Sequence, residues 1–243
     1  MTEEPHDIEA LIQDLESPDK PAVRRAVDAL SPLACRIPGL AIRLTDYLRQ
    51  PQRKNLWAIA YVLAHVPCPC ATTLEVLCAA LDHGDPDIRW AIALKLTQLA
   101  NSDPRVLEML FELLTEGTPT QKRMATYCIR DLKLADRESL DALVRLLGDP
   151  HPLVRVAATT SLKERNDCDD EVKKSLLGIF LNDPDGRVRN ATAITLAHLG
   201  TPSVSFLNAL NEAVRGSDKG LRKAAEAGLK ILKHKGPISR GDQ

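Results

Sequence analysis

The side chains that could do chemistry do not combine into a recognisable catalytic or metal-binding motif. Cys68-Pro69-Cys70 comes closest, because two thiolates could hold half of a tetrahedral zinc site, but no second pair has comparable spacing. The six histidines are scattered, and none is followed by glutamate. The sequence also contains no glycine-rich phosphate loop and no nucleophile elbow. We therefore expect a protein that is not an enzyme and that has no metal site and no cofactor.

Charge and hydropathy restrict the function further. The formal net charge is −1, which argues against a protein that binds mainly the nucleic acid backbone. No apolar run approaches the roughly 18 residues that a membrane span needs, and the first residues do not resemble a secretory signal. We expect a cytoplasmic protein without a membrane segment. Acids dominate residues 1–19 and bases dominate residues 215–243, which fits either two solvated ends or head-to-tail self-association.

One local pattern recurs through the chain at steps of 32 to 34 residues. Its central residue, position 0 of a repeating frame, is usually arginine, preceded by an apolar residue and followed by small residues and a leucine. A period of this length is typical of stacked supersecondary units, and the apolar residues have helical spacing, so each unit is predicted to contain two helices. Position 0 falls on Arg24, Leu56, Arg89, Arg123, Arg155, Arg189 and Arg222.

A short breaker separates the two predicted helices of each unit, and in three units it is Asp-Pro. These pairs are Asp85-Pro86, Asp149-Pro150 and Asp183-Pro184. Aspartate can cap an incoming helix, and proline is tolerated in its first turn. We therefore expect the second helix of a unit to begin at this pair.

The sequence resembles the HEAT-repeat family, and more narrowly the short HEAT-like repeats named after phycobilisome lyases. The resemblance rests on "DPDIRWAIALKL", "DPHPLVRVAATTSL" and "DPDGRVRNATAITL" and extends over roughly residues 6–234. It implies an all-α, right-handed α-solenoid of about seven two-helix repeats, with the second helices on the concave face. Residues 1–234 would form one array, and residues 235–243 a basic tail. It also implies a ladder in which each position-0 arginine pairs with the aspartate of a neighbouring repeat, except around Leu56 and "EGTPTQ".

Large side chains gather at frame positions that should face away from the core. Trp57 and Trp90, the only tryptophans, both occupy position +1 and lie 33 residues apart. Tryptophan, tyrosine and methionine are enriched at binding hot spots, so this surface is predicted to bind a partner. Burial of the indoles between repeats is the alternative. The predicted binding residues are Trp57, Tyr61, Trp90, Leu94, Met124 and Tyr127.

Three functions are compatible with these features. The first is a protein-protein interaction scaffold that holds a partner segment on its concave face. The second, implied by the resemblance, is a bilin lyase-like protein or chaperone subunit whose aromatic residues stack on a tetrapyrrole. The third is similar to the HEAT-like alkylpurine DNA glycosylases, with Asp131 as the acid, but the low charge disfavours DNA as a partner. Partner identity and oligomeric state stay open.

Overall fold

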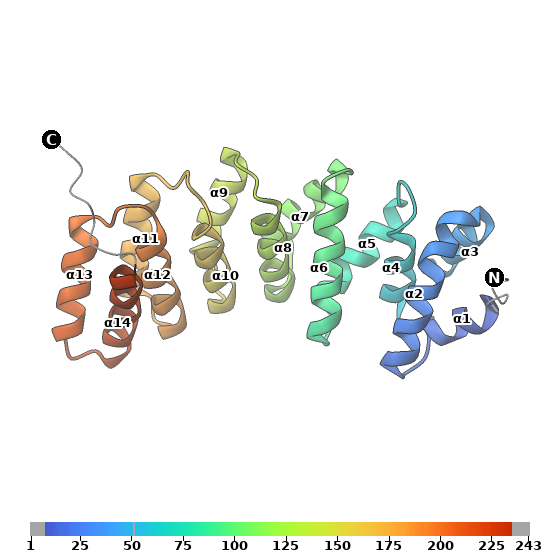
Figure 1. Ribbon diagram of the computed structural model, residues 1–243, viewed down its shortest axis with the longest axis horizontal. Coiled ribbons are helices and arrows are strands. Elements are labelled where there is room, and N and C mark those ends of the chain that lie inside the picture. The colour runs from blue at the N-terminus through green and yellow to red at the C-terminus, as the bar shows by residue number, and fades with distance from the viewer. Residues whose placement is uncertain (1–7, 51, 235–243) are drawn as a thin grey trace. The chain divides into compact units, whose positions relative to one another are not determined.

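The computed structural model describes residues 8–50 and 52–234, and their regular structure is entirely helical (Figure 1). Fourteen helices in these residues form seven consecutive pairs, which confirms the predicted all-α repeat fold. The first helices of the pairs are α1 (Ile8–Leu15), α3 (Pro38–Leu48), α5 (Ala71–Ala80), α7 (Pro104–Glu116), α9 (Arg137–Leu146), α11 (Asp170–Asn182) and α13 (Val204–Arg215). The second helices are α2 (Lys20–Arg36), α4 (Leu56–Leu63), α6 (Pro86–Ala100), α8 (Pro119–Leu132), α10 (Pro152–Leu162), α12 (Gly186–His198) and α14 (Lys219–His234).

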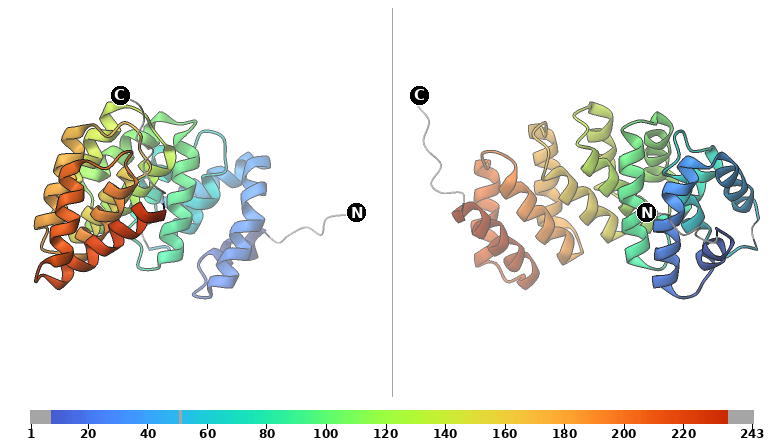
Figure 2. Two further views of the ribbon diagram at one scale, coloured as in Figure 1. Left: turned by 60° about the vertical axis from the view of Figure 1, so that its left-hand side comes forward. Right: turned by 45° about the vertical axis from the view of Figure 1, so that its right-hand side comes forward.

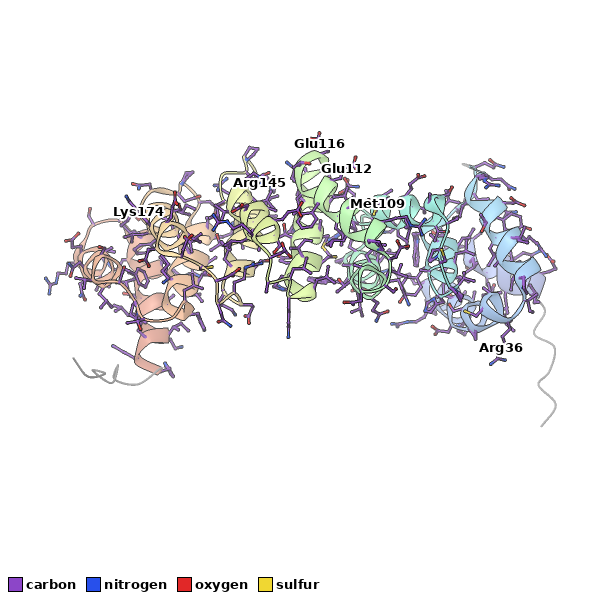
Figure 3. All side chains as sticks on the ribbon, turned by 90° about the horizontal axis from the view of Figure 1, so that it is seen from above. Arg36, Met109, Glu112, Glu116, Arg145 and Lys174 are labelled. Atoms are coloured by element: carbon purple, nitrogen blue, oxygen red, sulfur yellow. The ribbon has the colours of Figure 1, made fainter. Side chains whose placement is uncertain are left out.

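The chain divides into two compact units, residues 1–110 and 111–243, and the division falls inside α7. A single array over residues 1–234 stays a prediction, and the proposed tail, residues 235–243, lies outside the described residues. In the first unit, α4 packs against α2, α3 and α5. In the second unit, α8, α10, α12 and α14 lie side by side in chain order (Figures 1 and 2). The labelled side chains of Arg145 and Lys174 lie on the outer side of α9 and α11 (Figure 3).

Small residues let neighbouring second helices approach closely. Ala157 and Ala158 of α10 are fully buried, as are their counterparts Ala224 and Ala225 of α14. Gly228 of α14 lies so near α12 that an added Cβ would be 3.3 Å from the carbonyl oxygen of Ala193. The alanine-rich pattern that defines the repeat therefore sets the spacing between helices, and the leucines fill the space around it.

An ion-pair ladder links consecutive repeats of the second unit. The Arg155 guanidinium donates to both carboxylate oxygens of Asp183, at 2.8 and 2.9 Å, and also to the carbonyl oxygens of Asp149 and Pro150. In the next repeat, Arg189 pairs with Asp218 at 2.7 Å. Each arginine is thus held by the turn of the following repeat, as the family resemblance implied.

The fourth repeat continues the ladder with a lysine. Lys122 pairs with Asp149 at 3.2 Å, so Lys122 occupies position 0 and the assignment of Arg123 was wrong by one residue. With this correction, position 0 lies 33 residues from both Arg89 and Arg155. In the first unit Leu56 supplies no charge, and Lys20 of α2 pairs with Asp85 instead.

Side chains from the preceding turns cap α6, α10 and α12, but only the cap of α6 is the aspartate of an Asp-Pro pair. Asp85 is the N-cap of α6, as predicted. Asp149 and Asp183 lie too far before α10 and α12 to be their N-caps. Instead, their carboxylates accept hydrogen bonds from the backbone N–H groups of His151 and Asp185. His151 and Asp185 are the caps. The capping prediction was therefore correct for α6 and wrong by two residues for α10 and α12.

The cap of α12 gives a pH-dependent prediction. Hydrogen bonds from the Arg187 side chain and then from the Arg187 backbone lower the pKa of Asp185 from 3.8 to about 2. The native state therefore binds this proton less tightly than the unfolded state, and the stabilisation is present above the ordinary pKa and lost as pH falls through 3.8 towards 2. We expect Asp185→Asn to be less stable than the wild type at about pH 6, with the difference closing near pH 2 in urea unfolding. A difference independent of pH would contradict this assignment.

Candidate binding surface on the second helices

Trp90 and Leu94 form an exposed apolar strip on α6. Their exposed fractions are 48% and 62%, and they lie one helical turn apart, so their side chains are neighbours. The other exposed large apolar residues of the described chain are not spaced one turn from each other. Within residues 8–50 and 52–234, this strip is the place where two such side chains are adjacent on one helix.

Trp57 has the same frame position as Trp90 but a different environment. Its ring meets that of His83 edge to face, with the centroids 6.1 Å apart, and its side chain is half-buried. The Nε1 atom is buried and has no hydrogen-bond partner among the protein atoms. Trp57 thus belongs partly to the packing between α4 and the turn that precedes α6.

Tyr61 lies one turn after Trp57 on α4, and its ring contacts two polar side chains, those of Lys95 and His65. The Lys95 ammonium lies 5.5 Å from the centroid of the Tyr61 ring, and the His65 ring lies 5.5 Å from it. Burial, and secondarily the charge of Asp28, raises the pKa of the Tyr61 hydroxyl. We use the name α4–α6 surface for Tyr61, His65, Trp90, Leu94 and Lys95.

The hydrogen bonds of His65 fix its protonation state. Its Nδ1 lies 3.0 Å from the carbonyl oxygen of Tyr61, which can only accept, so Nδ1 carries the hydrogen. The Lys95 ammonium, 3.0 Å from Nε2, then donates to that nitrogen. Burial and the charge of Lys95 lower the pKa of His65, which keeps the ring neutral at pH 7. Lys95 therefore carries the positive charge of the α4–α6 surface.

The two predicted binding residues on α8, Met124 and Tyr127, belong to the second unit and differ in burial. Met124 is 1% exposed and lies in the core, so its prediction as a binding residue was wrong. The one-residue shift to Lys122 explains this error, because Met124 then occupies the buried position +2. Tyr127 is half-buried, with the Arg130 guanidinium 5.0 Å from its ring centroid.

The structure also places the residues that were considered for chemistry. Cys68 is exposed on a turn, and Cys70 is the N-cap of α5, with its Sγ 3.3 Å from the Thr73 hydroxyl. No group of three or more potential metal ligands occurs in the part of the chain that the structure describes. Asp131 is half-exposed and pairs with its neighbour Arg130 at 2.7 Å. No helix in residues 8–50 and 52–234 has the length and apolar character needed to span a membrane.

Comparison with known families identifies the repeats. A family model described as HEAT repeats matches residues 41–130 and 118–197, which together make up more than half of the chain. The chain belongs to the HEAT-repeat family. This match supports the family that the repeated arginine and alanine pattern indicated, without distinguishing the phycobilisome-lyase type. A comparison with curated proteins gave no match.

Several solved structures, among them designed armadillo repeat proteins, are similar to this chain. Human deoxyhypusine hydroxylase is 17% identical, with 96% of this chain and 86% of the hydroxylase covered and a TM-score of 0.44. A designed armadillo repeat protein is 16% identical, with coverage of 93% and 100% and a TM-score of 0.40. She4p is 16% identical, with coverage of 93% and 42% and a TM-score of 0.45. At these values the likenesses carry no information about function.

Proposed function

We propose that this HEAT-repeat protein is a non-catalytic scaffold that binds a segment of a partner protein on the α4–α6 surface. The observation that carries the proposal is the exposed Trp90–Leu94 strip on α6, the helix whose Lys95 lies against the ring of Tyr61. Tryptophan and tyrosine are over-represented among residues that dominate binding energy, and adjacent exposed apolar side chains on a folded protein mark interaction sites. Trp57 supports this surface from the α4 side. Tyr127, on α8 of the second unit, stays a separate predicted binding residue.

The compartment is part of the same proposal. All six cysteines are free thiols, which supports a reducing, cytoplasmic location.

The phycobilisome-lyase resemblance makes a linear tetrapyrrole the second candidate ligand. The observation that favours it is the exposed, flat indole of Trp90, on which such a pigment could stack. A change in the absorption spectrum when a bilin is mixed with the protein, absent with Trp90→Ala, would support this alternative. The DNA glycosylase alternative gains no support, because Asp131 is held by Arg130.

The test of the scaffold proposal uses peptides selected from a random displayed library against the full-length protein. We expect Trp90→Ala and Leu94→Ala each to weaken binding of a selected peptide by about 30-fold, or about 2 kcal/mol. Both variants should change the free energy of unfolding by less than about 1 kcal/mol, because neither side chain is in the core. Titration and thermal unfolding of the same preparations measure the two effects.

Two controls make the result specific. Lys174→Ala, on the outer side of α11, should leave binding unchanged. Trp57→Ala should lower stability more than Trp90→Ala does, because its indole is half-buried against His83. If no peptide is selected, or if selected peptides bind Leu94→Ala as tightly as wild type, the scaffold proposal is wrong.

A further inference from the structure

Lys95 places a positive charge where the repeat otherwise has core residues. It occupies position +6 of its repeat, and its counterparts in the other six repeats are uncharged and buried. They are Leu30, Val62, Cys128, Ser161, Thr195 and Gly228. A charged side chain in a column that is otherwise buried costs free energy, and such residues are often retained for a function.

The charge of Lys95 has no internal counterion. No carboxylate of the described residues forms an ion pair with its ammonium, whose neighbours are the neutral His65, the ring of Tyr61 and the thiol of Cys35. Burial lowers the pKa of Lys95, as expected for a cation whose lost hydration is not replaced by a negative charge. Cys35 is engaged through its Sγ–H, which donates to the carbonyl oxygen of His65 at 3.0 Å.

Three consecutive repeats build this site, and each fixes one side of it. α2 supplies Cys35, α4 and the turn after it supply Tyr61 and His65, and α6 supplies Lys95. Leu94 directly precedes Lys95 in α6, and Trp90 lies one turn before Leu94, so the exposed apolar strip and Lys95 lie on the same stretch of one helix. A segment that lies along this stretch of α6 and reaches Lys95 would remove further water from its ammonium, and a negative charge on the segment would compensate for that loss.

We propose that the partner segment of the scaffold carries an aspartate or glutamate that pairs with Lys95, next to a bulky apolar side chain that packs on Trp90 and Leu94. This inference rests on the proposed scaffold function and names the chemistry of its ligand. A single carboxylate matches the single ammonium, whereas a doubly charged phosphate would be only partly neutralised. Asp28, which acts on Tyr61, would add repulsion that a dianion feels more strongly.

The test compares peptide selections on the wild type and on Lys95→Glu. The random displayed library is selected in parallel against each full-length protein. Peptides from the wild type should be enriched in Asp or Glu beside Leu, Ile, Phe or Trp. Peptides from Lys95→Glu should lose this acidic residue and gain Lys or Arg. Lys54→Glu is the matched control, because Lys54 is exposed before the start of α4 and the change in net charge is identical. It should select the same acidic peptides as the wild type.

The dissociation constant of a synthetic peptide, chosen from those selected on the wild type, makes the test quantitative. We expect Lys95→Met to weaken its binding tenfold or more, and replacement of the peptide's Glu by Gln to do the same. The two changes should not be additive, because each removes the same pair. Lys95→Met removes the charge without adding one, so it provides the test if Lys95→Glu does not fold.

The outcomes distinguish a failure of the acidic-partner inference from a failure of the scaffold proposal. If selected peptides require Trp90 and Leu94 but show no acidic enrichment, or bind Lys95→Met as tightly as wild type, the acidic partner is excluded and the scaffold proposal stands. If the peptides bind independently of Trp90 and Leu94, or if none is selected, both proposals fail.

Discussion

Replacing Phe206 by alanine is expected to lower the free energy of unfolding by about 3–5 kcal/mol, the usual range for a buried phenylalanine. Phe206 of α13 and Phe180 of α11 are both buried, and their rings meet edge to face, with centroids 6.1 Å apart and an interplanar angle of 85°. Truncation would leave a cavity between two first helices of neighbouring repeats. It would also remove an aromatic contact that contributes about 0.5–1.5 kcal/mol beyond burial.

Urea unfolding followed by circular dichroism would measure this loss, and two further variants show whether the pair is its source. Leu181→Ala alters the exposed neighbour of Phe180 on the same helix and should cost less than about 1 kcal/mol. Phe180→Ala combined with Phe206→Ala should cost less than the sum of the two single changes, because the rings touch. Strict additivity, or a loss for Phe206→Ala no larger than for Leu181→Ala, would show that the two rings do not form this contact.

Replacing Asp183 by alanine should be nearly as damaging, with a loss of about 3 kcal/mol. The side chains of Asp183 and Arg155 are only 6% and 12% exposed, and the guanidinium has two hydrogen bonds to the carboxylate. Removal of the carboxylate leaves a largely buried cation without a counterion, and also releases the backbone N–H of Asp185. Breaking such a pair from one side costs more than the pair itself contributes.

A surface pair provides the comparison for Asp183. Asp46 and Arg49 form an ion pair of similar length, 3.0 Å, but their side chains are 59% and 65% exposed. Asp46→Ala should therefore cost well under about 1 kcal/mol in the same unfolding assay. Adding Arg155→Met to Asp183→Ala should recover part of the loss, because the unpaired charge is removed. If Asp183→Ala and Asp46→Ala lower the free energy of unfolding equally, burial does not strengthen the ion pairs of the ladder.

The helices and their pairing could be predicted from the sequence because the same pattern is repeated seven times. The clear units establish the period and the register between them, so one unit that matches poorly, "QKRMATYCIRDL", did not prevent the fold from being predicted. The same averaging hid a local detail. Arginine is the usual residue at position 0, so Arg123 was chosen over its neighbour Lys122, although either can carry the charge. The error moved Met124 from the core to the surface.

The candidate site was predicted only in part, because exposure depends on contacts outside the helix. Trp57 and Trp90 have the same frame position, but Trp57 is half-buried with its ring against that of His83, whereas Trp90 is 48% exposed. No helical pattern contains that information. Lys95 and His65 were missed, although a signal for Lys95 was present: it is the charged member of a column of otherwise uncharged residues. Comparing the residues that share one frame position in all seven repeats, and not only the positions within one helix, would have identified Lys95.

The packing of each helix against helices close to it in the chain has a consequence for the kinetics of folding. α12, for example, packs against α10, α11 and α14, and the Arg155–Asp183 pair closes a separation of only 28 residues. Contacts of this kind give a low contact order, and helical proteins of low contact order fold in microseconds to milliseconds. A short closed loop costs little chain entropy, so structure can start in any repeat and spread to the next one. Fast local closure also shortens the time during which the alanine- and leucine-rich faces of adjacent repeats are open to aggregation.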